Sequence, residues 1–225
     1  MSWERSKTLS LIQRDFLLKF FERSQDFFLT GGSALGIFYL DHRVSYDLDL
    51  FTTSPVEWRR VDALVSWVCD TIGAERSIVV DEPYFRRYKL RRGQEQHTID
   101  LVVETVPQVD KEKNRFGVVI VDTIREIGVN KLTALLGRAE IKDLIDLYFL
   151  SQNGFDILGH VEAAKQKDGG MEPTVLSFLL SRVFVREIPD YVIAELSAED
   201  LNRFLDDLRK GLAEMAFPGE HEMNT

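Results

Sequence analysis

The chain of 225 residues is 44% hydrophobic and 29% charged, enough for a sizeable core in one large domain or in one domain with a helical extension. Its formal net charge of −9 opposes non-specific binding to nucleic acid, and its single cysteine excludes disulfides within the chain. No apolar run approaches the ~20 residues that span a bilayer, the N-terminus lacks the apolar core of a signal peptide, and the glycine patterns of P-loop and dinucleotide enzymes are absent. We therefore expect a cytoplasmic protein with no membrane partner.

The first predicted elements lead to a glycine-rich turn. An amphipathic helix is predicted over residues 6–24, where apolar residues recur at helical spacing, and a short apolar strand follows it. The turn Gly31-Gly32-Ser33 then leads into an apolar helix over residues 34–40. Consecutive backbone N–H groups at the start of a helix bind anions, and Ser33 adds a hydroxyl. This turn is therefore a candidate phosphate site.

Residues 46–51 are the most informative segment, because polar and apolar side chains alternate along it. On a strand, Asp47 and Asp49 would project from one face and Leu48 and Leu50 from the other. Two carboxylates this close repel each other, and a divalent cation held by their hard oxygen atoms would remove that repulsion. Beside a phosphate site, the pair suggests a site for a nucleoside triphosphate and its metal. The alternative is an edge strand with two acids exposed to solvent.

The turn, the helix and the Asp-x-Asp strand together resemble the core signature of the nucleotidyltransferase superfamily with the DNA polymerase β-like minimal fold. More narrowly, the chain resembles the AbiEii-like nucleotidyltransferases, toxins of type IV toxin–antitoxin and abortive-infection systems, through the string GGSAL…HRVSYDLDLF. The resemblance covers residues 27–150. It implies an α+β fold, in which a mixed sheet is flanked by helices and followed by a C-terminal helical region.

The segment after the Asp-x-Asp strand is predicted to form one helix and three strands. Pro55 suits the first turn of a helix that continues to Ile72, and Gly73 suits its end. The spacing then changes to a period of two, which predicts strands over residues 76–80, 84–90 and 98–103.

The middle of these strands carries the densest basic patch of the chain. Arg87, Lys89 and Arg91 alternate with other residues and therefore share one face. We interpret the patch either as a solvated strand face or as a contact for a triphosphate or a nucleic acid.

The last of these strands contains an acid, Asp100, among β-branched and other apolar residues. An acid in such a strand needs a partner or a metal. In the polymerase β-like fold a third carboxylate on a neighbouring strand completes the metal site, and Asp100 matches that role in order and context. The alternative is an edge-strand acid paired with one of the arginines.

Residues 122–150 resemble the family's second conserved block, a lysine-bearing helix followed by a helix with an Arg-Asp-x-x-Asp motif. Here Lys142 replaces the arginine, which keeps the cation but loses the guanidinium fork. The resemblance implies that Lys131 contacts the triphosphate and that Asp143 lies at the active site. The alternative is that Asp143 and Asp146 form an acidic helix face exposed to water.

The remaining segments complete the predicted organisation. A polar loop is predicted over residues 104–115, a strand over 116–121, and further helices near 155–167, 173–186 and 197–215. We therefore divide the chain into a nucleotidyltransferase core (residues 1–125), a helical region that completes the cleft (126–217) and a disordered tail (218–225).

The predicted activity is transfer of a nucleoside monophosphate from a nucleoside triphosphate to an acceptor hydroxyl, with release of pyrophosphate. One or two Mg²⁺ ions, with Mn²⁺ as an alternative, would be held by the carboxylates of Asp47, Asp49 and Asp100. The residues predicted to contact the nucleotide are Gly31, Gly32, Ser33, Arg43 and Lys131, although Arg43 suits the cap of a turn equally well.

The acceptor favoured by the resemblance is RNA, such as the 3′ end of a transfer RNA, held by Arg87, Lys89 and Arg91. The alternatives are a small molecule, as in aminoglycoside nucleotidyltransferases, and a protein hydroxyl. A different class of function, a catalytically inactive module that acts through protein contacts, also stays open. The resemblance further implies a cognate antitoxin as partner.

Overall fold

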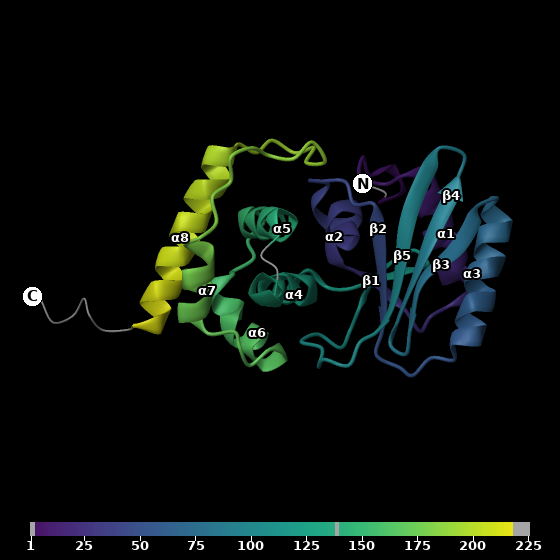
Figure 1. Ribbon diagram of the computed structural model, residues 1–225, viewed down its shortest axis with the longest axis horizontal. Helices are drawn as coiled ribbons and strands as arrows, with labels where there is room; N and C mark the ends of the chain where they lie inside the picture. The colour runs from purple at the N-terminus through teal and green to yellow at the C-terminus, as the bar shows by residue number, and fades with distance from the viewer. Residues whose placement is uncertain (1–2, 138–139, 218–225) are drawn as a thin grey trace, which may run out of the picture. The chain divides into compact units, whose positions relative to one another are not determined.

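The computed structural model describes residues 3–137 and 140–217, and the chain divides into two compact units, Met1–Ile127 and Gly128–Thr225 (Figure 1). The first unit contains a mixed β-sheet with helices, and the described part of the second unit is helical. The α+β architecture predicted from the sequence is therefore confirmed. The tail predicted over residues 218–225 lies outside the described residues.

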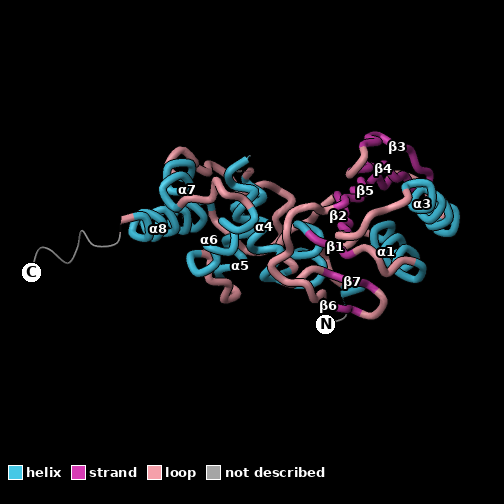
Figure 2. The backbone as a smooth tube through the Cα atoms, turned by 90° about the horizontal axis from the view of Figure 1, so that it is seen from below, coloured by secondary structure: helices cyan, strands magenta, loops and turns pink. Residues whose placement is uncertain are grey.

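The sheet of the first unit has seven strands in the order β3-β4-β5-β2-β1-β7-β6 (Figure 2). The pairs β2–β5 and β1–β7 are parallel and the other pairs are antiparallel. Its strands are β1 (Phe28–Thr30), β2 (Asp47–Thr52), β3 (Glu75–Glu82), β4 (Phe85–Arg92), β5 (Glu95–Val103), β6 (Asn114–Phe116) and β7 (Val119–Val121). The strand that carries the Asp-x-Asp pattern is thus an interior strand, so the edge-strand alternative for Asp47 and Asp49 is wrong.

Two helices cover the apolar face of the sheet, α1 (Leu11–Arg23) and α3 (Trp58–Ile72) (Figure 2). Register places Leu48 beside Ile99, and Ile99 beside Tyr88, so these buried side chains share one face. The hydroxyl of Tyr88 donates to Asp62 of α3, which identifies this face as the one that the helices cover.

The first helix begins later than the apolar spacing predicts. A short 3-10 turn, η1 (Trp3–Arg5), precedes it, and α1 starts only after Ser10. Ser10 and Gln13 form a capping box, in which each side chain accepts a hydrogen bond from the backbone N–H of the other residue. The cap satisfies the first turn and fixes the start of the helix.

The region predicted as a loop and a strand over residues 104–121 contains a short hairpin instead. Strand β6 pairs with β7 across a turn at Gly117, whose φ of 65° suits glycine. The first two residues of β6 were predicted as loop because their side chains are exposed and give no alternating signal. The predicted strand over 116–121 is correct at Phe116 and from Val119 onward, and a turn at residues 117–118 interrupts it.

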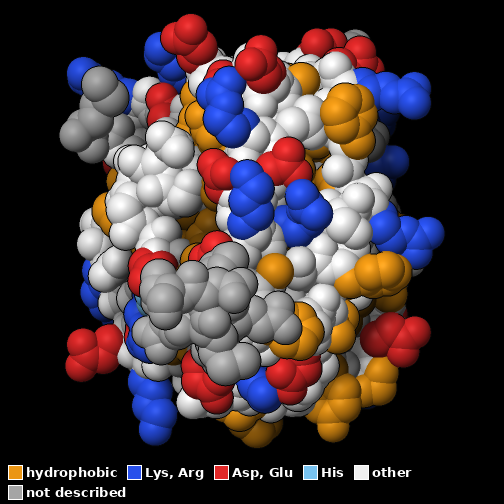
Figure 3. All heavy atoms as spheres, turned by 90° about the vertical axis from the view of Figure 1, so that its left-hand side faces the viewer, with side chains coloured by type: hydrophobic (Ala, Val, Ile, Leu, Met, Phe, Trp, Pro, Cys, Tyr) orange, Lys and Arg blue, Asp and Glu red, His pale blue; other side chains and the backbone are white. Residues whose placement is uncertain are grey.

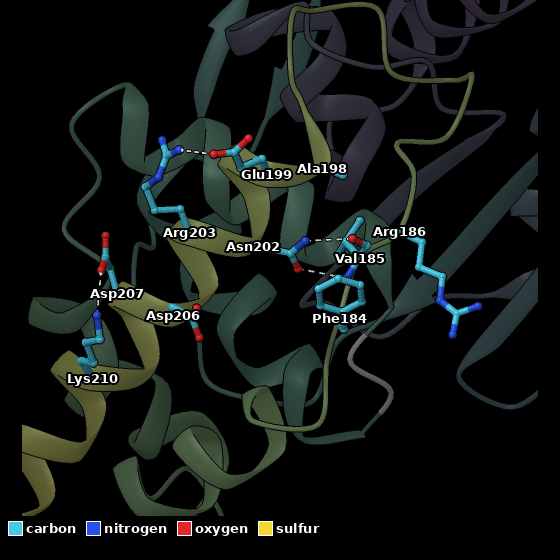
Figure 4. A pocket seen from close by; sticks show the side chains of 10 residues that line it. All are labelled: Phe184, Val185, Arg186, Ala198, Glu199, Asn202, Arg203, Asp206, Asp207 and Lys210. Atoms are coloured by element: carbon cyan, nitrogen blue, oxygen red, sulfur yellow. Dashed lines mark hydrogen bonds and ion pairs between the residues drawn. The ribbon is translucent and has the colours of Figure 1, made fainter.

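The described helices of the second unit match the predicted helices with one correction. They are the part of α4 (Ile124–Gly137) beyond residue 127, α5 (Ile141–Gln152), η3 (Leu158–His160), α6 (Val161–Lys167), α7 (Pro173–Leu180) and α8 (Ala198–Ala216). The helix predicted over 173–186 ends at Leu180. Beyond it the side chain of Asn202 bonds both the N–H and the carbonyl of Val185, at 3.0 and 2.8 Å, and holds the chain in a non-helical path (Figure 4).

The longest helix of this unit, α8, buries a stripe of four leucines and exposes the rest of its surface. On the face seen in Figure 3, acidic and basic side chains are interspersed. Arg203 of α8 pairs with Glu199 and Asp200, and such exposed pairs contribute little to stability. In the ranges 3–137 and 140–217, none of the helices has the length and apolar character required to cross a membrane.

Candidate functional site

The three predicted metal-binding carboxylates lie on the face of the sheet opposite α1 and α3. Asp47 and Asp49 alternate along β2 with the buried Leu48 and Leu50, and both are partly exposed. Strand β5 runs parallel to β2 with Asp100 beside Asp49. Because side chains in register on neighbouring strands share a face, the three carboxylates form one acidic surface, hereafter the acidic face.

The glycine turn lies directly against this acidic face. It comprises the last residue of β1 and the short helix α2 (Gly31–Ala34), which continues into η2 (Leu35–Leu40). Gly31 has a φ of 69°, and a Cβ atom there would collide with a carboxylate oxygen of Asp49. Glycine is therefore required at this position for two reasons, the backbone conformation and the close approach to Asp49.

Ser33, on the same turn, has a buried hydroxyl. Its side-chain oxygen makes no hydrogen bond within the described part of the chain. A buried polar group without such a bond costs free energy, and functional sites are a common reason for tolerating one. A ligand oxygen in the turn would complete the hydrogen bonding of Ser33.

Arg43 is a cation in contact with the glycine turn. Its side chain is almost fully buried, and a Cβ atom at Gly32 would collide with its guanidinium. The guanidinium therefore packs directly on the backbone of the turn, and it also donates to the carbonyl of Val44 at 3.3 Å. The structure thus brings Arg43 to the glycine turn, and its contact with a nucleotide stays a prediction.

Asp100 makes a two-pronged ion pair with Arg87 of β4. The guanidinium Nε and Nη2 donate to the two carboxylate oxygens at 2.7 and 2.6 Å. The hydrogen bonds to Asp100 raise the pKa of Arg87, and the charges of Asp47 and Asp49 act in the same direction. Strand β5 lies between β4 and β2, so Asp100 is paired with an arginine, as the alternative proposed, but it does not lie on an edge strand.

The other two residues of the predicted basic patch, Lys89 and Arg91, differ in their surroundings. Arg91 pairs with Glu75 of the edge strand β3 at 2.6 Å, and both side chains are largely exposed. Lys89 lies between Arg87 and Arg91 on the same face and is exposed. The predicted basic patch is therefore present as a surface, with two of its three cations paired to carboxylates.

The acidic face fits a hard divalent cation by its chemistry. Asp47 and Asp49 supply carboxylate oxygens on one face beside a turn with an unsatisfied hydroxyl, and Mg²⁺ is commonly bound by one or two carboxylates together with substrate phosphates. Asp100 shares the face, but Arg87 engages both of its oxygens. Among the described residues, accordingly, no three acidic, histidine or cysteine side chains are arranged as a complete metal-binding group.

Lys131 and Asp143 form a second cluster, within the second unit. The ammonium of Lys131 on α4 lies 2.8 Å from Asp143 and 2.7 Å from Asp146, both on α5. The lysine side chain is 8% exposed and both aspartates are fully buried, so the exposed acidic helix face considered above is wrong. A contact of Lys131 with triphosphate stays a prediction.

One buried acid of the first unit was not identified from the sequence. Asp122 follows β7 and is 1% exposed, with the ammonium of Lys113 at 2.5 Å. Burial raises the pKa of Asp122, and the charge of Lys113 opposes that shift. An acid directly after the buried run Val119–Val121 is a sequence signal that could have singled it out, by the same reasoning as for Asp100.

The segment around Asp122 is fixed by further hydrogen bonds to acids. Buried Glu126 accepts from the backbone N–H groups of Val109 and Asp110, at 2.7 and 2.8 Å. Asp110 in turn accepts from the hydroxyl of Thr123. The predicted polar loop is therefore held in place by buried carboxylates.

Comparison with known proteins decides the family. The family model described as nucleotidyl transferase AbiEii toxin, type IV toxin–antitoxin system, matches residues 15–219. The chain belongs to the AbiEii nucleotidyltransferase family. Membership extends beyond residues 27–150, where the sequence resemblance was recognised, and includes most of the helical unit of this nucleotidyltransferase.

Two solved structures share the fold of this AbiEii protein. One is a protein from H. pylori described as a predicted nucleotidyltransferase, which is 22% identical with a TM-score of 0.58 over 91% of this chain and 94% of that chain. The other is JHP933 from Helicobacter pylori, also 22% identical with a TM-score of 0.58, over 91% of this chain and 92% of its own. No curated protein matches the chain.

Proposed function

We propose that this AbiEii nucleotidyltransferase transfers a nucleoside monophosphate from a nucleoside triphosphate to an RNA hydroxyl in a metal-dependent reaction. One observation carries the proposal: three carboxylates share one face, and one of them, Asp49, lies against a glycine turn whose Ser33 hydroxyl is buried and unsatisfied. An acidic surface next to a phosphate-binding turn is the arrangement that a metal–triphosphate complex requires.

Different residues of the first unit would bind the phosphates and the metal. The backbone N–H groups of the turn and the hydroxyl of Ser33 would donate hydrogen bonds to phosphate oxygens, with Arg43 behind the turn adding positive charge. Asp47, Asp49 and Asp100 would hold Mg²⁺, which when bound supplies charge neutralisation and a lower pKa for the attacking hydroxyl. The acceptor oxygen forms a bond to the α-phosphorus while the bond to the β-phosphate oxygen breaks, and pyrophosphate leaves.

The proposal is tested by incubating the purified protein with Mg²⁺, each of the four α-³²P-labelled ribonucleoside triphosphates and total cellular RNA or protein extract. We expect label in the RNA fraction with wild-type protein and a loss of at least about a hundredfold with Asp47→Ala. Label on protein or on a small molecule would retain the chemistry and replace the acceptor. No label in any fraction, together with no change of melting temperature on addition of Mg²⁺ and nucleotide, would favour the inactive binding module.

Lys89 provides the sharpest test of RNA as the acceptor, because the other two cations of the predicted basic patch, Arg87 and Arg91, pair with Asp100 and Glu75. We expect Lys89→Gln to raise KM for RNA about threefold to tenfold, with a shallower salt dependence, and to leave KM for the nucleotide unchanged. Steady-state transfer at several salt concentrations measures both constants. Arg60→Gln, which removes an 85% exposed cation of α3 outside the basic patch, is the matched control. An unchanged KM for RNA in Lys89→Gln would contradict a role of β4 in RNA binding.

Membership of the AbiEii family also indicates a protein partner. AbiEii proteins are the toxins of type IV toxin–antitoxin systems. We therefore infer a cognate antitoxin protein that limits the activity of this chain. Expression that is harmless without such a partner would count against the toxin role and would leave the nucleotidyltransferase assignment unchanged.

A further inference from the structure

Arg87 bonds Asp100, one of the three carboxylates proposed to hold the metal. Its guanidinium covers the carboxylate of Asp100 from the solvent side, since the arginine side chain is 42% exposed and that of Asp100 only 9%. Both oxygens of Asp100 accept hydrogen bonds from it. The carboxylate that would complete the metal site is therefore already occupied by a positive charge.

The arginine engages only this one acid of the three. Strand β4 pairs with β5, which places Arg87 directly opposite Asp100, whereas β2 lies on the far side of β5. Asp47 and Asp49 act on Arg87 through their charge, whereas Asp100 also accepts its hydrogen bonds. Two parts of the acidic face thus differ: Asp47 and Asp49 on β2, which Arg87 does not bond, and Asp100 on β5, which it does.

The chemistry of a guanidinium allows a second partner for Arg87. Its planar donors match a carboxylate and a phosphate equally well, with two parallel hydrogen bonds in either case. The ring of Phe85 lies on the same face of β4, with the guanidinium carbon 5.3 Å from the ring centroid. Arg87 therefore has an aromatic surface to rest on when it leaves Asp100, and it remains on the acidic face.

We propose that Arg87 exchanges partners when the metal–nucleotide complex binds. In the free protein Arg87 holds Asp100 and weakens cation binding there. A divalent cation at the acidic face takes over Asp100, and the released guanidinium turns to an oxygen of the substrate phosphates. The exchange keeps every charge paired, because the cation replaces the guanidinium at the carboxylate and the phosphate replaces the carboxylate at the guanidinium. This inference rests on the proposed metal site.

The exchange predicts that removing the arginine strengthens metal binding and weakens nucleotide binding. We expect Arg87→Gln to bind Mn²⁺ about tenfold more tightly than wild type without nucleotide, since one charge-assisted pair no longer competes for Asp100. The same variant should bind a non-hydrolysable triphosphate less tightly. Titration of Mn²⁺ followed by electron paramagnetic resonance measures the first constant without any turnover, and calorimetry measures the second at saturating Mn²⁺.

Three variants make the result specific. Arg91→Gln removes a cation from the same face of β4 but pairs with Glu75, so its Mn²⁺ affinity should equal that of wild type. Arg87→Lys, which keeps a charge but loses the fork, should lie between wild type and Arg87→Gln. Adding Asp100→Asn to Arg87→Gln should abolish the gain in Mn²⁺ affinity.

The outcomes separate the two proposals. Mn²⁺ binding that depends on Asp49 but is the same or weaker in Arg87→Gln would overturn the exchange and leave the proposed metal site standing. A gain that persists after Asp100→Asn would also overturn it, because the effect would be one of net charge alone. No Mn²⁺ binding by wild type or by Arg87→Gln would overturn both the exchange and the metal dependence. Circular dichroism and melting temperature confirm that each variant is folded.

Discussion

Asp49→Asn is expected to reduce nucleotidyl transfer about a thousandfold or more while the protein stays folded. Asp49 is the central acid of the site, since it lies beside Asp100 on β5 and against Gly31 of the phosphate turn. Asparagine has the same shape and fits the same space, but it lacks the charge that a divalent cation requires. The loss should appear in kcat and should persist at saturating nucleotide.

We do not expect Asp49→Asn to lower the free energy of unfolding. Three carboxylates on one face repel one another, and the hydrogen bonds of Arg87 go to only one of them, Asp100. Removing one of them should leave the free energy of unfolding unchanged or raise it, which is typical of residues retained for function. Urea denaturation followed by circular dichroism gives this number, with Glu82→Gln, an exposed acid of the same sheet, as the control. Full activity in Asp49→Asn would disprove the assignment of the acidic face.

Much of this site was predictable because it rests on alternation within strands. The pattern of Asp47 to Leu50 fixes which side chains share a face, and burial of Leu48 and Leu50 orients the strand. Asp100 was identified by the same logic, as an acid within an apolar strand. Local spacing carries this information for each strand, whereas the placement of Asp100 beside the β2 acids came from the resemblance to the polymerase β-like fold.

The pairing of Asp100 with Arg87 was left open, although the sequence contained the signal for it. A turn at Gly93 joins β4 to β5, and the ladder that starts from this turn pairs Arg92 with Glu95. Counting outward along an antiparallel hairpin then places Arg87 opposite Asp100. The strand boundaries given by the period alone were too imprecise to fix that register.

Features that depend on tertiary packing were not predictable in this way. The spacing of Asp143 and Asp146 suits a solvated acidic face as well as a buried one, because both use the same helical period. Only the approach of Lys131 from another helix decides between them. Similarly, the helix predicted to residue 186 ends at Leu180 because Asn202, distant in sequence, bonds the backbone of Val185.

Lys131→Met is expected to lower the free energy of unfolding by about 3–5 kcal/mol, the largest stability effect we predict. Asp143 and Asp146 are fully buried, and Lys131 lies within 2.8 Å of both. Methionine preserves the length of the side chain but leaves two carboxylates in the interior without that ammonium. Burying such charges costs far more than the loss of an exposed ion pair.

The matched control is Lys142→Met, on α5 itself. Lys142 is 38% exposed and pairs with Glu140, which is 45% exposed, so we expect a change within about 0.5 kcal/mol. Urea denaturation followed by circular dichroism compares the two variants. Hydrogen exchange should show faster exchange in peptides from α4 and α5 for Lys131→Met, because the loss of stability originates between these helices.

This prediction also determines how the activity of Lys131 variants is interpreted. The family resemblance implies a triphosphate contact for Lys131, yet an unfolded second unit would abolish transfer without any such contact. Adding Asp143→Asn and Asp146→Asn to Lys131→Met removes the buried charges, and we expect part of the stability to return. If transfer returns with it, the lysine acts through structure. If Lys131→Met is as stable as wild type and inactive, the buried ion cluster is not its main role, and the triphosphate contact is the better explanation.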